Sequence, residues 1–235
     1  MIIYVNGDSH SVGAEAVNPS AFANDGHKHW GTPHRHGHPE NIKVCYATQL
    51  ADKLGAGWIN QAESGGSNDR IIRTTDIFLE TSSIKDLFIL IGWTTWEREE
   101  WLHNDVYYQI SASGTDHVPT ELREKYKQWV IDTEHNYASN ELKWHTKIWD
   151  YHIKLERMGI PHLFFNTYSH FGHIASNNLE RLDWQDAYID PYNEKQTYYY
   201  WAKDNGIDTV SPNSYHFGVD AHTAWADRLY QYINH

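Results

Sequence analysis

The chain has 235 residues, of which 40% are hydrophobic and 14% aromatic, and its formal net charge is -12. A chain of this length and aromatic content can bury a core and is not typical of disorder. The acidic balance argues against a protein that binds nucleic-acid phosphates. The single cysteine, Cys45, excludes an internal disulfide and a cysteine-based zinc site.

Predicted strands and helices alternate along the chain. The apolar runs at residues 2–5 and 87–91 are typical of buried parallel strands and are too short to span a bilayer. Because such alternation is typical of parallel sheets, we expect an α/β fold, a three-layer α/β/α sandwich with a mainly parallel sheet of about five strands. In chain order the pattern predicts strand 1–5, helix 41–54, strand 58–60, helix 69–79, strand 86–92, a long helical stretch 121–158 that breaks near 137–140, strand 162–166, helix 195–205, a candidate edge strand 207–210 and helix 220–232.

The domain organisation expected from the sequence is a single domain over residues 1–235. No internal repeat and no Gly/Ser/Pro-rich linker divides the chain. Two segments exceed what a minimal sandwich needs, one near 17–39 and one near 93–118. We expect both to be insertions at the edge of the sheet, where ligand crevices form.

A short polar motif, Asn6 to Ser11, follows the first predicted strand directly. The loop that leaves the C-terminal end of a parallel strand faces the ligand crevice. Ser9, on a tight turn that contains Gly7, would therefore have an exposed hydroxyl with backbone amides around it, which suits a nucleophile. The alternative is that Asp8 or Ser9 only caps a turn.

A nucleophilic serine needs a base, and the C-terminal segment offers His216 in a loop before the closing helix. His222 falls inside that predicted helix, where packing is the simpler role. Position relative to the helix therefore singles out His216 among the 17 histidines of the chain.

Taken together, these motifs resemble the SGNH (GDSL-like) hydrolases, whose fold is a flavodoxin-like sandwich. The resemblance is carried by residues 7–9 (Gly-Asp-Ser), by 60–65 (Asn-Gln-Ala-Glu-Ser-Gly) after the second strand, and by the late His216. The amino-acid sequence of residues 64–75 and 91–94 is similar to that of a branch of the family common in phage genomes.

The resemblance implies a serine esterase without a cofactor or a metal. Ser9 would attack an ester carbonyl, its own amide and that of Gly65 would bind the oxyanion, and His216 would be the general base. We expect a carboxylic ester substrate, with an acetyl group on a glycan as the best candidate. The side chains expected to contact that substrate are Asp8, His10 and Trp93.

The sequence departs from the family pattern at two positions. Thr94 stands where the family has an Asn in the oxyanion hole, so either its hydroxyl or the amide of Asn68 would donate there. Asn213 stands in the acid position, three residues before His216, and Asp208 is a remote substitute. An Asn can orient an imidazole but cannot stabilise its cation, and losing that carboxylate costs about 10⁴ in turnover where it matters.

Two other interpretations stay open. The chain could be a catalytically weak or inactive SGNH-like module that binds a glycan or acts as a phage structural or interaction protein. It could also be a metal enzyme that uses the five histidines of residues 27–38, although no carboxylate-rich or H-E-x-x-H pattern accompanies them and a solvated loop is the simpler interpretation.

The aromatic residues of the second insertion also allow two interpretations. They could stack on a sugar at the mouth of a crevice, or form a small core of their own, which we favour. The partner expected is a small-molecule or glycan ester, with no nucleic acid and no membrane, and the oligomeric state is left open. Without a recognisable signal segment, we expect a cytoplasmic location, or the host cell or virion for a phage protein.

Overall fold

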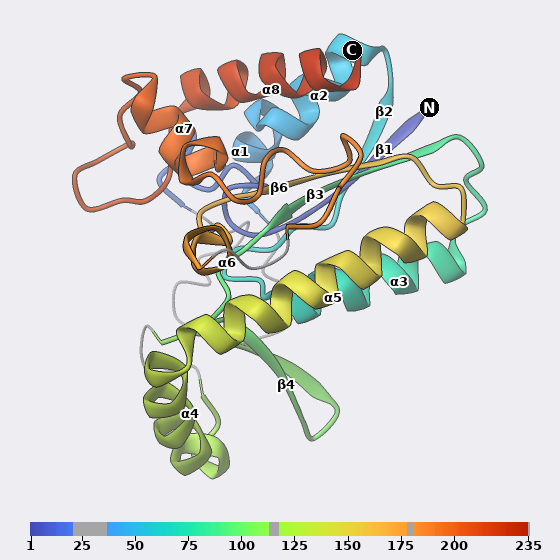
Figure 1. Ribbon diagram of the computed structural model, residues 1–235. Helices are drawn as coiled ribbons and strands as arrows, with labels where there is room; N and C mark the ends of the chain where they lie inside the picture. Colours follow the sequence, from blue (N-terminus) through green and yellow to red (C-terminus); the bar gives the residue numbers. More distant parts are fainter. Residues whose placement is uncertain (21–36, 113–117, 178–180, 235) are drawn as a thin grey trace.

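The computed structural model describes residues 1–20, 37–112, 118–177 and 181–234, apart from the side chains of 134 and 135. Its centre is a parallel sheet of four strands in the order β2-β1-β3-β6 (Figure 1). In register, Ile3 lies between Trp58 and Phe88, and Leu90 lies beside Leu163. The strands are β1 (Ile2–Asn6), β2 (Gly57–Asn60), β3 (Leu87–Trp93) and β6 (His162–Asn166).

The α/β fold class with a mainly parallel sheet is confirmed, but the sheet is narrower than expected. The candidate edge strand at 207–210 is not part of it, because Thr209 makes only an isolated antiparallel bridge with Phe217. Beyond β6, Tyr188 pairs with Phe164 through a single parallel bridge. A single bridge is too short to count as a fifth strand, so the sheet has four strands in the described part of the chain.

Three predicted helices are divided, and in the one expected at 195–205 the extended Thr197 separates a 3-10 turn from an α-helix. The helix expected at 41–54 breaks at Cys45, whose ψ of 157° is extended. The stretch expected at 121–158 breaks at Asn136, just before the expected point. The helices are α1 (Pro39–Val44), α2 (Tyr46–Leu54), α3 (Asn68–Thr81), α4 (Arg123–His135), α5 (Tyr137–Arg157), α6 (Gly172–Ser176), α7 (Tyr198–Asp204) and α8 (Val219–Ile233), with short 3-10 turns at Thr120–Leu122 and Glu194–Gln196.

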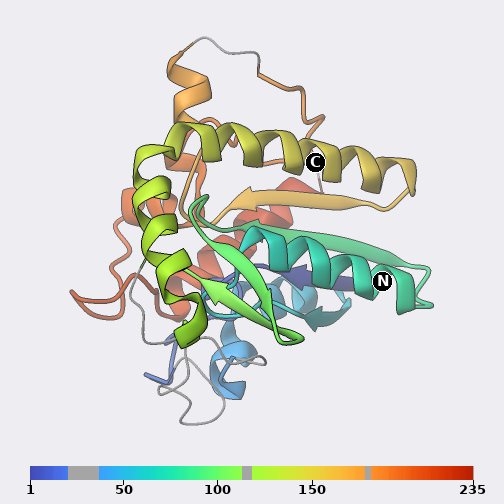
Figure 2. The ribbon, with the colours of Figure 1, turned by 90° about the horizontal axis from the view of Figure 1, so that it is seen from below.

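The helices form two layers around the sheet. Helices α2 and α8 cover one face, and α3 and α5 cover the other (Figures 1 and 2). Side chains alternate across a strand, so Ile3 and Val5 of β1 belong to the core that includes Trp225 of α8, whereas Tyr4 belongs to the core that includes Ile71 of α3. Both faces of the strands are therefore apolar, as a covered parallel sheet requires.

A two-stranded antiparallel hairpin and α4 lie below the sheet in Figure 1. The hairpin consists of β4 (Glu99–His103) and β5 (Val106–Ile110). Trp101 and Ile110 of the hairpin pack with Tyr126 of α4 in a small core of their own. The predicted second insertion thus has a satellite core, whereas Trp93 and Trp96 belong to the main core beside α5.

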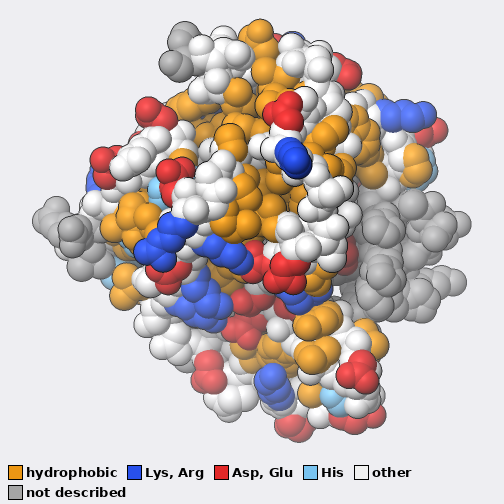
Figure 3. All heavy atoms as spheres, turned by 90° about the vertical axis from the view of Figure 1, so that its right-hand side faces the viewer, with side chains coloured by type: hydrophobic (Ala, Val, Ile, Leu, Met, Phe, Trp, Pro, Cys, Tyr) orange, Lys and Arg blue, Asp and Glu red, His pale blue; other side chains and the backbone are white. Residues whose placement is uncertain are grey.

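The N-terminal edge of the sheet carries the loops after α3 and α5. Figure 3 views the molecule from this side and shows hydrophobic side chains gathered on it, with charged groups around them. A shallow hollow there is lined by residues such as Ile84, Met158 and Pro161. In the described residues, no helix is both long and apolar enough to cross a bilayer.

Candidate active site

The turn after β1 depends on Gly7. Its φ of +157° is one that side chains rarely adopt, and a Cβ at this position would lie 2.1 Å from Ser11 Oγ and 2.9 Å from the Gly92 carbonyl oxygen. Ser11 Oγ is itself held by the hydroxyl of Tyr46, which donates to it at 2.6 Å. The chain can therefore bend sharply at the end of β1 and place Asp8, Ser9 and His10 at the C-terminal edge of the sheet.

A cavity of about 450 Å³ opens beside this turn. Ser9 of the first motif and His216 of the C-terminal loop, which are far apart in sequence, both line it, and so does Gly65. No hydrogen bond joins Ser9 to His216 within the described contacts, and such bonds are often long before substrate binds. The full lining is Asp8, Ser9, His10, Ser64, Gly65, Thr95, Glu97, Arg98, Ser111, Ala112, Tyr168, Tyr215 and His216.

The backbone amides of two lining residues have no acceptor among the described residues. Neither the Ser9 nor the Gly65 amide donates a hydrogen bond to another described residue, although neighbouring amides do, such as that of Gly66 to the Glu63 carbonyl at 2.8 Å. Gly65 has a φ of +75°, a left-handed conformation that suits glycine. Amides without a partner at a cavity wall are suited to bind a developing oxyanion.

His216 is paired with a carboxylate that the sequence did not single out. Its Nδ1 lies 2.8 Å from Oε2 of Glu15, and the hydroxyl of Ser214 donates to the same oxygen at 2.6 Å. Glu15 has a φ of +64°, unusual for a residue with a side chain. Strained residues of this kind cluster at functional sites, which makes Glu15 a candidate site residue.

Asn213, predicted in the acid position, lies elsewhere. It is exposed and lines a separate surface hollow with Lys203 and Asp208. Asp208 pairs with Lys203 at 2.8 Å, and this contact lowers the pKa of its carboxyl. Neither side chain is among those that line the cavity of Ser9, so Glu15 occupies the place beside the imidazole.

Asp8 is buried beneath the turn and organises it. Its Oδ1 accepts from the His10 amide at 3.0 Å, and its Oδ2 accepts from the hydroxyls of Thr94 and Thr167, both at 2.9 Å. Burial acts to raise the pKa of Asp8, but His10, the guanidinium of Arg98 and the two hydroxyls outweigh it, so the pKa is lowered. An ionised Asp8 therefore ties the turn to the ends of β3 and β6.

The two residues predicted as alternative oxyanion donors bond to each other. The Thr94 amide donates to Asn68 Oδ1 at 2.9 Å, and Asn68 Nδ2 donates to the Thr94 carbonyl at 3.2 Å. Both side chains are fully buried and neither lines the cavity. Trp93, predicted to contact substrate, is also fully buried and packs edge-on against Phe164 and Tyr151.

His10 lines the cavity beside the proposed base. Its ring lies 5.5 Å from that of His216, edge to face, and also contacts Tyr198. Burial lowers the pKa of His10 to about 4 against the attraction of Asp8, so the imidazole is neutral at pH 7. A neutral ring at this position limits charge repulsion when His216 becomes protonated.

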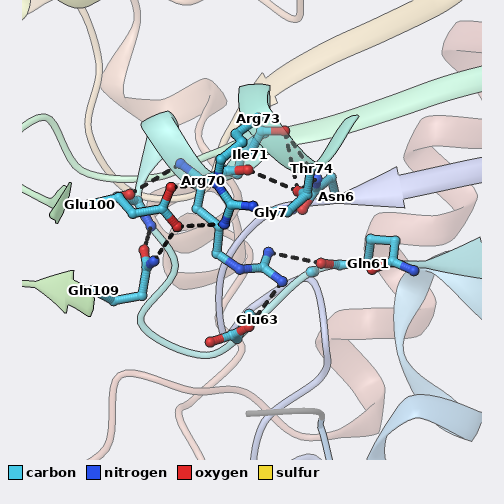
Figure 4. A network of polar contacts seen from close by, with 12 residues as sticks. Asn6, Gly7, Gln61, Glu63, Arg70, Ile71, Arg73, Thr74, Glu100 and Gln109 are labelled. Carbon is cyan, nitrogen blue, oxygen red and sulfur yellow. Dashed lines mark hydrogen bonds and ion pairs between the residues drawn. The ribbon is translucent and has the colours of Figure 1, made fainter. Parts of the chain in front are cut away.

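The loop that carries Gly65 is held by an ion pair on one side and by hydrogen bonds on the other (Figure 4). On one side Arg70 bonds Glu63 at 2.9 Å, and on the other the Ser67 amide donates to Gln109 Oε1 of the hairpin at 2.9 Å. Gln109 in turn donates to Glu100, which is bonded by both Nε and Nη2 of Arg73. The hairpin is therefore part of the scaffold of the cavity wall.

Within the part of the chain that the structure describes, a group of side chains able to hold a metal lies away from this cavity. His152 Nδ1 and His162 Nε2 are 2.8 Å apart, with Glu156 nearby, at the start of β6 and thus at the opposite edge of the sheet. His162 Nδ1 also contacts the Ile160 carbonyl at 2.8 Å. Most of the predicted histidine-rich segment lies outside the described residues, and its last histidine, His38, caps α1.

No model of a known protein family matches the chain. No curated protein matches it either. The search of solved structures returned proteins of the class that the motifs predicted. They include an acetyl xylan esterase (TM-score 0.45, 12% identity, 98% of each chain covered) and a G-D-S-L family lipolytic protein from Desulfitobacterium hafniense (TM-score 0.36, 11% identity, 98% of each). A third is an acetyl xylan esterase from the rumen bacterium Butyrivibrio proteoclasticus (TM-score 0.46, 13% identity, 99% of this chain and 63% of that one).

None of these matches tests the resemblance to a phage branch. With TM-scores below 0.5 and identities of 11–13%, they do not decide the chemistry of this chain. That chemistry has to be argued from the contacts of Ser9, Gly65, Glu15 and His216.

Proposed function

We propose that the protein is a serine esterase that hydrolyses a carboxylic ester through an acyl-enzyme on Ser9. The observation that carries the proposal is the contact between His216 and Glu15 at 2.8 Å on the wall of the cavity that Ser9 also lines. A nucleophile, an imidazole and a carboxylate that orients it are the three groups that ester hydrolysis by serine needs.

The contact with Glu15 determines which ring nitrogen of His216 is the base. When Nδ1–H donates to the carboxylate, Nε2 carries the lone pair and can accept the proton of the Ser9 hydroxyl. Ser9 Oγ then attacks the ester carbonyl, and the carbonyl π electrons move onto the oxygen. The amides of Ser9 and Gly65 donate to that oxyanion.

Collapse of the tetrahedral intermediate breaks the bond between the acyl carbon and the alcohol oxygen. The proton held on His216 Nε2 goes to that oxygen, so a neutral alcohol leaves and the acyl group stays on Ser9. Water attacks the acyl-enzyme in the same way, and its proton passes through His216 to Ser9 Oγ. The products are one carboxylic acid and one alcohol, and the free serine is restored.

The carboxylate of Glu15 has a specific role in this scheme. It holds the imidazole in the required tautomer and stabilises the imidazolium that forms during both attacks. Its place in the turn that follows Ser9 means that one short segment supplies the nucleophile, one oxyanion amide and the acidic partner. For the acyl group we propose acetyl, on a glycan alcohol, since a cavity of about 450 Å³ with tyrosine rings and polar groups fits one sugar unit.

Hydrolysis of 4-nitrophenyl acetate tests the proposal. We expect turnover by the wild type and its loss, by at least about 10³-fold, in Ser9→Ala and in His216→Asn. Ser83→Ala, which changes an exposed serine, is the matched control and should leave turnover unchanged. Equal rates in the wild type and Ser9→Ala would refute Ser9 as the nucleophile.

A further inference from the structure

Two charged side chains line the cavity without a part in the proposed reaction. Glu97 and Arg98 follow β3 and line the same cavity as Ser9. Oε2 of Glu97 is enclosed by protein and has no hydrogen-bond donor among the described residues, and the same holds for the hydroxyl of the adjacent Thr95. Buried polar atoms without partners are uncommon, and in a binding cavity they indicate a ligand that supplies the missing bonds.

Arg98 offers hydrogen-bond donors, whereas the carboxylate of Glu97 offers acceptors. Its Nη1 donates to the Thr94 hydroxyl at 2.7 Å and lies 3.4 Å from Asp8 Oδ2. The contacts of the described residues engage neither Nε nor Nη2 of this guanidinium. The side chain is 24% exposed, so these N–H groups are accessible donors at the cavity wall.

The combination of a carboxylate and a guanidinium discriminates between ligand charges. An anionic group beside Arg98 would also face the carboxylates of Glu97 and Asp8, and a cationic group beside Glu97 would face Arg98. A neutral hydroxyl avoids both penalties, because it can donate to a carboxylate and accept from a guanidinium. Several hydroxyls on adjacent carbons would satisfy both side chains at once.

Two tyrosine rings from the C-terminal half of the sequence also line the cavity. Tyr168 packs against Tyr199 at 4.8 Å between ring centres, which fixes its orientation, and Tyr215 is 66% exposed. Aromatic rings with an exposed face pack against apolar surface, and a sugar ring presents C–H groups on its faces with hydroxyls at its rim.

We propose that Glu97 and Arg98 bind the hydroxyls of the sugar and thereby select a neutral, polyhydroxylated leaving alcohol over a charged or plain aliphatic one. The inference rests on the proposed esterase function, because it concerns the leaving group of that reaction. Glu97 is the specificity-determining residue, and it acts on the alcohol rather than on the reacting carbonyl.

The test compares two acetates that differ only in the alcohol. In 4-nitrophenyl acetate the leaving group has no hydroxyl to bind, whereas a mono-acetylated methyl glucoside carries three free ones. A lost hydrogen bond to a charged group predicts a fall in kcat/KM of about 10- to 100-fold for the glucoside ester in Glu97→Ala. For 4-nitrophenyl acetate we expect a change below about twofold, since the reacting groups are untouched.

Three controls make the result interpretable. Glu97→Gln keeps the size of the side chain and should show a smaller but selective loss, which separates recognition from misfolding. Glu80→Ala removes an exposed carboxylate of α3 and should change neither rate. Acetylcholine and acetylsalicylate, a cationic and an anionic acetate, should both be poorer substrates of the wild type than the glucoside ester.

Each outcome decides a different point. Selective loss on the glucoside ester in both Glu97 variants supports the inference. Equal loss on both acetates, no loss on either, or a wild type that prefers acetylcholine or acetylsalicylate overturns it while leaving the esterase proposal intact. A wild type that hydrolyses none of the esters refutes the proposed function itself, and the inference with it.

Discussion

Replacing Glu15 by Gln isolates the contribution of its charge to catalysis. The amide is nearly the same size as the carboxylate, and its oxygen can still accept hydrogen bonds from His216 and Ser214. What is lost is the attraction between the carboxylate and the imidazolium that forms when Ser9 gives up its proton. The variant therefore tests the electrostatic part of the proposed triad and leaves the packing of the turn in place.

The geometry sets the size of the effect. With the charges about 4 Å apart, the attraction is about 4 kcal/mol at an effective dielectric constant of 20 and about 1 kcal/mol in bulk water. The Glu15 and His216 side chains are 30% and 21% exposed, so the pair lies between these limits. We expect a loss of about 2–3 kcal/mol, which is about 30- to 150-fold in kcat.

The assay is the initial rate of 4-nitrophenyl acetate hydrolysis, with thermal unfolding as the check on folding. A second variant adds Asn213→Asp to Glu15→Gln, which places an acid at the position that the family pattern uses. Because Asn213 is exposed and lies outside the cavity lining, we expect no recovery of activity. A Glu15→Gln rate within twofold of the wild type, or recovery through Asn213→Asp, would refute the reasoning.

Three further predictions concern the scaffold. Gly7→Ala should lower the free energy of unfolding by about 2–4 kcal/mol, because the alanine Cβ would clash with Ser11 Oγ and the Gly92 carbonyl oxygen. Urea denaturation measures this loss, and an unchanged midpoint would contradict the geometry of the turn. Gln109→Leu leaves the buried Ser67 amide without an acceptor, which predicts a loss of about 1–3 kcal/mol and slower acylation of Ser9, whereas the exposed Gln128→Leu should change neither. The free energy of unfolding should also decrease as the pH is lowered from about 6.5 to about 4. The reason is that burial lowers the pKa of several histidines in the folded state, whereas the same histidines in the unfolded chain are protonated near pH 6.5. The folded-state pKa is about 4 for His10, about 4 for His145 and about 3 for His222. Three such groups give a slope of up to about 4 kcal/mol per pH unit, and a flat profile over this window would refute the burial of these rings.

Much of the fold could be predicted because its signals are local. The apolar run of β3 and the glycine-containing turn after β1 depend on neighbouring residues only, so periodicity and turn chemistry reveal them. The number of strands in the sheet and the points at which helices break were harder to predict. Tyr188 makes one bridge rather than a strand, and the helix break at Cys45 carries no glycine or proline to mark it.

The acidic partner of His216 could not be predicted in the same way. Glu15 and His216 are 201 positions apart, and only the folded chain brings them together. The local signal, an acid six residues after Ser9 in a turn that begins at a glycine, is too common to single out. The pattern of the family directed attention instead to Asn213, which the fold leaves at the surface.

The burial of Trp93 illustrates a related limit. An aromatic side chain at the end of a strand can point into a crevice or into the core, and periodicity does not distinguish the two when both faces of the sheet are covered. Trp93 packs against Tyr151 of α5, so the aromatic groups that line the cavity come instead from Tyr168 and Tyr215.

The most direct test of the central claim, that Ser9 is an activated nucleophile, is intact mass spectrometry after incubation with a fluorophosphonate. The wild type should gain the mass of one phosphonyl group, and Ser9→Ala should gain none. A wild type that stays unmodified, or a Ser9→Ala variant that is modified to the same extent, would contradict the account.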